Sequence, residues 1–90
     1  MTADNAIALL QQILHATGQK TRLNDTQVKV FRLIWAGESY GAIASSTGYD
    51  YDYIKQVGSK LWQLLSKALN QDVSKRNLHI VFQQYAQTIA

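Results

Sequence analysis

Residues 38–61 carry the strongest structural signal in the chain and read ESYGAIASSTGYDYDYIKQVGSKL. Their apolar residues recur with helical spacing, first over a short run at 40–46 and then over a longer one that starts near Tyr51. Gly48 lies between the two runs, where a tight turn needs a residue that adopts a left-handed backbone cheaply. Two helices joined by such a turn form the layout of a helix-turn-helix.

The side chains at the expected crossing of these two helices fit that layout. Ala44 is small where the second helix would pass over the first. Ile43, Ile54 and Val57 are apolar at the positions that would join both helices to a core. Short helix pairs with a glycine turn also occur in unrelated folds, so the pattern predicts the motif without fixing its function.

Helical periodicity also dominates the rest of the 90 residues. It predicts an N-terminal accessory helix within 1–18 and a C-terminal helix within 74–90 that begins after Ser74. No stretch alternates with the two-residue period of a strand. The predicted fold class is all-α, with about five helices in a single domain over 1–90 and a helix-turn-helix core over 23–69.

The second helix has the clearest start signal. Asn24 is a good N-cap, and Gln27 follows it at the spacing of a capping box. Leu23 and Val28 flank the cap and can form a hydrophobic staple. These residues predict a helix that begins after Asn24 and ends before Gly37.

The longest helix is expected over 51–69, with Asp50 as its cap. When it is projected at about 100° per residue, the apolar residues from Ile54 onward fall within one arc and the polar residues within the opposite arc. The helix therefore has one face to bury and one face for solvent or a partner. The polar arc contains three lysines and no acid: Lys55, Gln56, Ser59, Lys60, Gln63, Ser66 and Lys67.

One glycine and two tryptophans are expected in the interior. Gly58 lies on the apolar arc of the longest helix, although glycine costs about 1 kcal/mol there relative to alanine. The close approach of another helix would explain that choice. Trp35 and Trp62 lie on or beside apolar stripes, so we expect both to pack in the core.

Composition argues against an enzyme and against a metal or cofactor site. The chain has no cysteine, which removes disulfides, cysteine zinc sites and thiol catalysis. His15 and His79 each lack a second ligand one helical turn away. No catalytic triad or phosphate-binding loop can be traced in the sequence. We therefore expect no catalytic activity, no metal and no cofactor.

Hydropathy argues against a membrane protein. The longest apolar run has five residues, from Ala6 to Leu10. A bilayer span needs about 20 such residues. No basic region precedes the run, as a secretory signal would require. We expect a soluble, cytoplasmic protein with no membrane contact.

The chain is mildly basic, with a net charge of +3, and its charge is segregated. In 19–36, four basic residues outnumber one acid, which gives +3, whereas 37–54 carries three acids and no base. The next segment, 55–69, returns to +3. Such an arrangement permits nucleic-acid binding without demanding it.

Three runs of the sequence resemble the LuxR/GerE-type DNA-binding domain: Leu23–Phe31, Gly37–Ala44 and Tyr53–Val57. That family is four-helical and reads the major groove with its third helix. The resemblance covers residues 23 to about 69 and implies that the helix over 51–69 is the recognition helix.

A closer likeness extends over nearly all of the chain after residue 20. Gly48–Asp50, Tyr53–Lys55 and Val57–Ser66 are similar to the N-terminal helix-turn-helix domains of cyanobacterial multidomain signalling proteins. In those proteins the domain precedes NB-ARC-type or other NTPase modules and WD-type repeats. This likeness implies a fold more firmly than an activity.

The LuxR/GerE resemblance also implies a set of DNA-contacting residues. Lys55 matches the family's lysine that contacts the DNA backbone or base edges, and the family's contacts at the helix start would fall on Asp52 and Tyr53. The lysines of the polar arc and the basic residues around the second helix would contact phosphates, since phosphate contacts provide affinity. The expected DNA-binding residues are Lys55, Gln56, Ser59, Lys60, Tyr53, Lys29, Arg22 and Lys20.

Two functions follow from these features. The first is a DNA-binding domain, acting in transcription regulation and placing the fourth helix in the major groove of double-stranded DNA. The alternative is a protein-interaction adaptor that uses the same fold without DNA. Two carboxylates near the recognition helix, Asp50 and Asp52, favour the adaptor because carboxylates repel phosphates. Three tyrosines, Tyr49, Tyr51 and Tyr53, favour it because tyrosine is enriched at protein interfaces. Homodimerisation through the first or fifth helix is open in either case.

Overall fold

The computed structural model describes residues 1–18 and 22–89 and, for residue 89, the backbone alone. Those residues form five helices and no strand, so the predicted all-α fold class is confirmed. The helices are α1 (Ala3–Ala16), α2 (Asp25–Trp35), α3 (Tyr40–Thr47), α4 (Tyr51–Leu69) and α5 (Leu78–Ile89). The first four begin and end within about one residue of the predicted positions.

Side-chain caps explain where the helices begin. Asn24 Oδ1 accepts a hydrogen bond from the backbone N–H of Gln27 at 2.8 Å. Gln27 Oε1 in turn accepts one from the backbone N–H of Asn24 at 2.9 Å, so the predicted capping box is present. The same kind of bond caps three other helices, through Thr2, Ser39 and Asp50.

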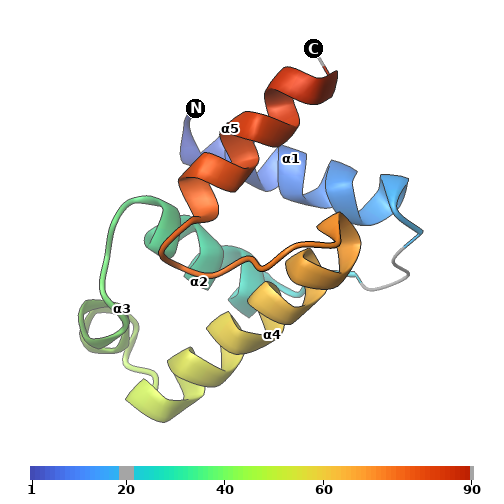
Figure 1. The fold of residues 1–90 in the computed structure, drawn as a ribbon. Coiled ribbons are helices and arrows are strands. Elements are labelled where there is room, and N and C mark those ends of the chain that lie inside the picture. The colour runs from blue at the N-terminus through green and yellow to red at the C-terminus, as the bar shows by residue number, and fades with distance from the viewer. Residues whose placement is uncertain (19–21, 90) are drawn as a thin grey trace.

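The core lies where α1, α2, α4 and α5 meet. Phe31 of α2 is fully buried, and its ring packs against Trp35 and against Phe82 of α5, with centroid distances of 6.1 and 5.8 Å. Figure 1 shows α5 crossing α1 at the end of the molecule opposite to α3 and the start of α4. The terminal helices therefore close the core at the end remote from α3, and α1 also packs against α4.

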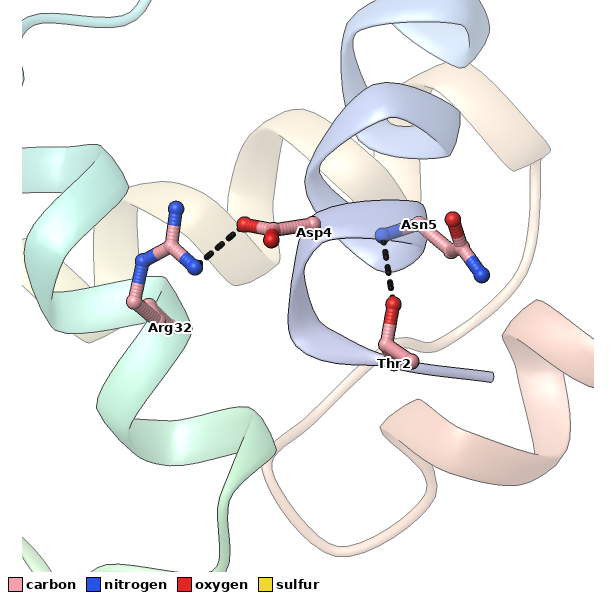
Figure 2. A network of polar contacts seen from close by, with 4 residues as sticks. All are labelled: Thr2, Asp4, Asn5 and Arg32. Atoms are coloured by element: carbon pink, nitrogen blue, oxygen red, sulfur yellow. Dashed lines mark hydrogen bonds and ion pairs between the residues drawn. The ribbon is translucent and has the colours of Figure 1, made fainter.

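A surface ion pair ties the start of α1 to the end of α2. Arg32 donates to the carboxylate of Asp4, and both side chains remain largely exposed. Figure 2 shows this pair beside the α1 cap, where Thr2 Oγ1 accepts from the backbone N–H of Asn5. Buried apolar residues of both helices lie in the core, and the ion pair is an additional contact at the surface.

The predicted start of the C-terminal helix after Ser74 was wrong, because α5 begins at Leu78. Asn77 causes the difference. Its side chain accepts from the N–H of Ser74 at 2.8 Å and donates to the carbonyl of Asp72 at 2.8 Å, which closes a turn in place of a helix. Helical spacing predicts that Ile89 shares the apolar face of α5, but its side chain lies outside the described part of the chain.

The α3–turn–α4 unit forms the predicted helix-turn-helix. Gly48 ends α3 with φ of 78°, a left-handed conformation that costs a residue with a Cβ about 1–2 kcal/mol. Ile43 of α3 and Ile54 and Val57 of α4 are buried, as the motif requires. Figure 1 shows α3 beside the N-terminal end of α4. The exposed side of α4 is thereby left clear of α3.

Candidate nucleic-acid interface

The exposed face of α4 is the main candidate for a binding surface. Ile54, Val57, Gly58, Leu61 and Leu65 bury the opposite face against the core. On the exposed face an open groove is lined by six polar residues: Asp52, Lys55, Gln56, Ser59, Lys60 and Gln63. The predicted division of α4 into an apolar and a polar arc is thus present in three dimensions.

The start of α2 borders this face. A depression of about 110 Å³ lies between the two helices. Asn24 and Gln27 line it from α2, and Tyr53, Gln56 and Lys60 line it from α4, above Val57. The capping-box residues of α2 therefore lie beside the polar face of the helix-turn-helix. The sugar-phosphate backbone of a nucleic acid lying along α4 would meet the first turn of α2 at this point.

The lysines of the exposed face are available to an anionic partner. Within the described residues, neither Lys55 nor Lys60 forms an ion pair. Lys55 Nζ lies 5.5 Å from the ring centroid of Tyr51, a weak cation–π contact that leaves its charge in solvent. Both lysines can reach an anion without breaking a salt bridge.

The two carboxylates near the start of α4 differ in their surroundings. Asp50 Oδ1 accepts a hydrogen bond from the backbone N–H of Asp52 at 3.3 Å, so this carboxylate faces its own helix terminus. There the helix dipole favours its charge. The side chain of Asp52 is exposed and lines the groove. Of these two carboxylates, Asp52 alone lies on the candidate surface.

Two of the predicted DNA-contacting residues, Lys29 and Arg22, line neither the groove nor the depression. Lys29 is exposed but lines neither depression, because it lies about 200° around α2 from Gln27. Arg22 is exposed just before the α2 cap. Lys20 lies outside the described residues. The five candidates on α4 do come together, along the groove or the neighbouring depression: Tyr53, Lys55, Gln56, Ser59 and Lys60.

The tyrosines of the predicted protein-binding cluster are exposed at the start of α4. The exposed fractions are 39% for Tyr49, 48% for Tyr51 and 42% for Tyr53. The rings of Tyr49 and Tyr53 meet edge to face, with centroids 5.5 Å apart. This pair adjoins the polar groove, because Tyr53 also lines the depression beside it. The two candidate surfaces therefore share Tyr53.

Three residues of the interface were not among those predicted from the sequence. Gln63 follows Ser59 by four residues on the same side of α4, so helical spacing was a sufficient signal for it. Asn24 and Gln27 were assigned only as a cap. Their place beside Lys60 depends on how α2 packs against α4, which local sequence does not encode.

The described residues contain no group of three or more histidine, cysteine, aspartate or glutamate side chains that would hold a metal ion. His79 Nε2 lies 3.0 Å from the carbonyl oxygen of Trp35, and its ring stacks on that tryptophan with centroids 3.8 Å apart. In the same part of the chain, no helix is long and apolar enough to cross a membrane.

Comparison with known families adds one finding to this geometry. Residues 1–85 match the model of a family described as the N-terminal helix-turn-helix of vWA-MoxR associated proteins. The chain belongs to that family. The match includes α1 and most of α5 as well as the helix-turn-helix itself. No curated protein and no solved structure matched the chain.

Membership in this helix-turn-helix family bears out part of the resemblance seen in the sequence. It supports a helix-turn-helix domain over nearly the whole chain. It does not extend to the LuxR/GerE-type family, or to domains that precede NB-ARC-type modules in cyanobacterial proteins. A helix-turn-helix is a fold typical of DNA binding, although a fold alone does not establish function.

Proposed function

We propose that this domain binds double-stranded DNA with α4 in the major groove. The observation that carries the proposal is the exposed face of α4, which is polar and holds two unpaired lysines, Lys55 and Lys60, within the described chain. It belongs to the second helix of a helix-turn-helix, the helix that enters the major groove in that motif. The major groove is about 12 Å wide and admits such a helix.

The charge distribution supports contact with phosphates. The segment 55–69 carries three lysines and no acid. Lys55 and Lys60 lie on opposite sides of the polar stripe of α4. Each can therefore face one phosphate wall of the DNA major groove. Each phosphate that a lysine neutralises releases counterions, and this makes the affinity depend on salt.

We extend the proposal to transcription regulation, with a reading mode like that of LuxR/GerE-type domains. The support is the sequence likeness over 23–69 and the helix-turn-helix layout itself. A homodimer through α1 or α5 would present two copies of α4 to a palindromic site, the arrangement that helix-turn-helix dimers use.

The experiment is fluorescence anisotropy with a labelled duplex of about 30 base pairs at several salt concentrations. The wild type should bind, with log K falling as log salt rises. The double variant Lys55→Ala/Lys60→Ala should lower that slope by about 1.8, the value expected for two lost phosphate contacts. Lys29→Ala removes one charge and is the control for the single variants Lys55→Ala and Lys60→Ala, because Lys29 is exposed but lines neither the groove nor the depression.

A failure of the wild type to bind at ~50 mM salt would rule the proposal out, because phosphate attraction is strong under those conditions. An equal loss of slope in Lys29→Ala would also contradict it, by showing that the charge effect is not located on α4.

A second candidate function rests on the exposed tyrosines. Tyr49, Tyr51 and Tyr53 together form the kind of aromatic surface that is enriched at protein interfaces. In this adaptor function the domain would associate with itself or recruit an effector. Sedimentation at rising protein concentration tests self-association. A dimer that Tyr49→Ser/Tyr53→Ser abolishes, together with no binding to DNA, would favour the adaptor.

A further inference from the structure

We infer that four residues of α4 read the edges of base pairs and select sites rich in adenine and cytosine. The four, here called the reading stripe, are Asp52, Gln56, Ser59 and Gln63. The inference rests on the proposed DNA binding and adds to it the class of sequence that the domain prefers. It follows from the placement, freedom and chemistry of these side chains.

The reading stripe is a straight row along the exposed face of α4. At about 100° per residue its four members fall within about 60° of arc. Lys55 and Lys60 lie about 70° to either side of the centre of the row. All six residues line the same open groove. The stripe would face the floor of a major groove while the two lysines face its phosphate walls.

The length of the stripe limits the site. From Asp52 to Gln63 the helix rises about 16 Å, the height of roughly five stacked base pairs. One copy of the domain therefore reads no more than about five base pairs directly.

The four side chains are free to bind. Each is exposed, and none of the side-chain hydrogen bonds formed by the described residues uses one of them. Asp50 makes an instructive contrast, because its carboxylate is already bound to the amide of Asp52. A side chain without an internal partner can give its hydrogen bonds to a base edge.

The chemistry of the stripe determines the bases. Gln56 and Gln63 can each form the paired hydrogen bonds to N6 and N7 that identify adenine. Asp52 only accepts hydrogen bonds when ionised, so it fits the amino group of cytosine at N4. Ser59 accommodates either donor or acceptor. Guanine is usually read by an arginine or lysine, and the centre of the stripe contains neither.

Asp52 sharpens the selection because an unsatisfied carboxylate is costly in an interface. Facing the O6 or N7 acceptors of guanine, it would lose water without gaining a partner. The carboxylate that opposes general DNA affinity would thus improve discrimination among sequences. Lys55, one turn further along α4, limits its repulsion of nearby phosphates.

The test is selection of bound sites from a randomised duplex, followed by sequencing, with the wild type and three variants. The wild type should enrich a run of up to about five base pairs containing adenine and cytosine on the strand that is read. A wrong base at one of these positions should weaken binding about 5- to 150-fold. Gln56→Arg should change adenine to guanine at one position, and Asp52→Asn should change cytosine to adenine at another.

Gln11→Arg is the control, because Gln11 is exposed on α1 and the substitution adds the same charge. It should leave the selected sequence unchanged. Salt-dependent binding without any enriched sequence would overturn this inference and leave the proposed function standing. An enriched sequence that neither Gln56→Arg nor Asp52→Asn alters would also overturn it. Loss of all DNA binding in the wild type would overturn both.

Discussion

The hydroxyl of Tyr40 occupies the space that a side chain at Gly58 would need. A Cβ at position 58 would lie 2.8 Å from Tyr40 Oη and 3.2 Å from two of its ring carbons. The same hydroxyl accepts a hydrogen bond from Trp62 Nε1 at 3.0 Å. A residue of α3 is thereby fixed against two successive turns of α4. The predicted close approach at Gly58 is confirmed.

Gly58→Ala should therefore destabilise the protein, although alanine is the better helix former by about 1 kcal/mol. Overpacking against Tyr40 costs about 1–3 kcal/mol, so we expect a net loss of about 1 kcal/mol in urea unfolding. In a Tyr40→Ala background the space is vacant, and the same substitution should stabilise. An equal cost in both backgrounds would show that Tyr40 is not the cause.

Gly48 and Gly41 should respond in opposite directions to alanine. Gly48 has φ of 78°, so Gly48→Ala should cost about 1–2 kcal/mol. Gly41 is inside α3, and its added Cβ would meet only Ser39 Oγ, at 3.9 Å. Gly41→Ala should therefore stabilise by about 0.5–1 kcal/mol. Thermal unfolding of the two variants gives the comparison, and a shared sign would contradict the turn geometry described here.

Much of this fold was predictable from the sequence because its signals are local. The Asn24 cap, Gly48 and the two arcs of α4 each depend on residues within a few positions of one another. Packing between distant segments was less predictable. Val30 of α2 is fully buried because α1, α3 and α4 all pack against α2, which the local sequence does not reveal.

The candidate site was likewise predictable where its signals are local and unpredictable where it depends on packing between helices. Helical spacing alone placed Lys55, Gln56, Ser59 and Lys60 on one face, as the structure does. The position of the α2 start beside Lys60 required the tertiary packing of two helices. Trp62 packs against the core as expected, but it is only half-buried, and its indole N–H donates to Tyr40.

Loss of the α2 cap should measurably weaken the fold. Asn24→Ala removes the acceptor for the amide of Gln27 and disrupts the capping box. We expect a loss of about 1 kcal/mol in the free energy of unfolding. Asn24→Asp keeps an acceptor and suits the helix dipole, so it should retain most of the stability. If the two variants unfold at the same urea concentration, the cap is not the source of the effect.

The ion pair between Arg32 and Asp4 should contribute little to stability. The side chains are 47% and 79% exposed, respectively, and exposed pairs are worth about 0–1 kcal/mol. Asp4→Asn should lower the free energy of unfolding by less than about 0.5 kcal/mol. That difference should vanish at ~1 M salt, where the Debye length is about 3 Å. A salt-independent loss above ~1.5 kcal/mol would instead indicate a tightly held, desolvated pair.

Tyr53→Phe should separate the role of one hydroxyl in DNA binding from its role in folding. No hydrogen bond among the described residues uses the Tyr53 hydroxyl, so the variant should unfold like the wild type. Tyr53 lines the depression between α2 and α4, where a DNA backbone would pass in the proposed complex. A lost hydrogen bond to phosphate costs about 1 kcal/mol, or roughly fivefold in affinity.

Tyr49→Phe is the matched control, because Tyr49 packs against the ring of Tyr53 but lines neither the groove nor the depression. Equal affinities for Tyr53→Phe and the wild type, measured by anisotropy at low salt, would place the DNA backbone elsewhere on α4.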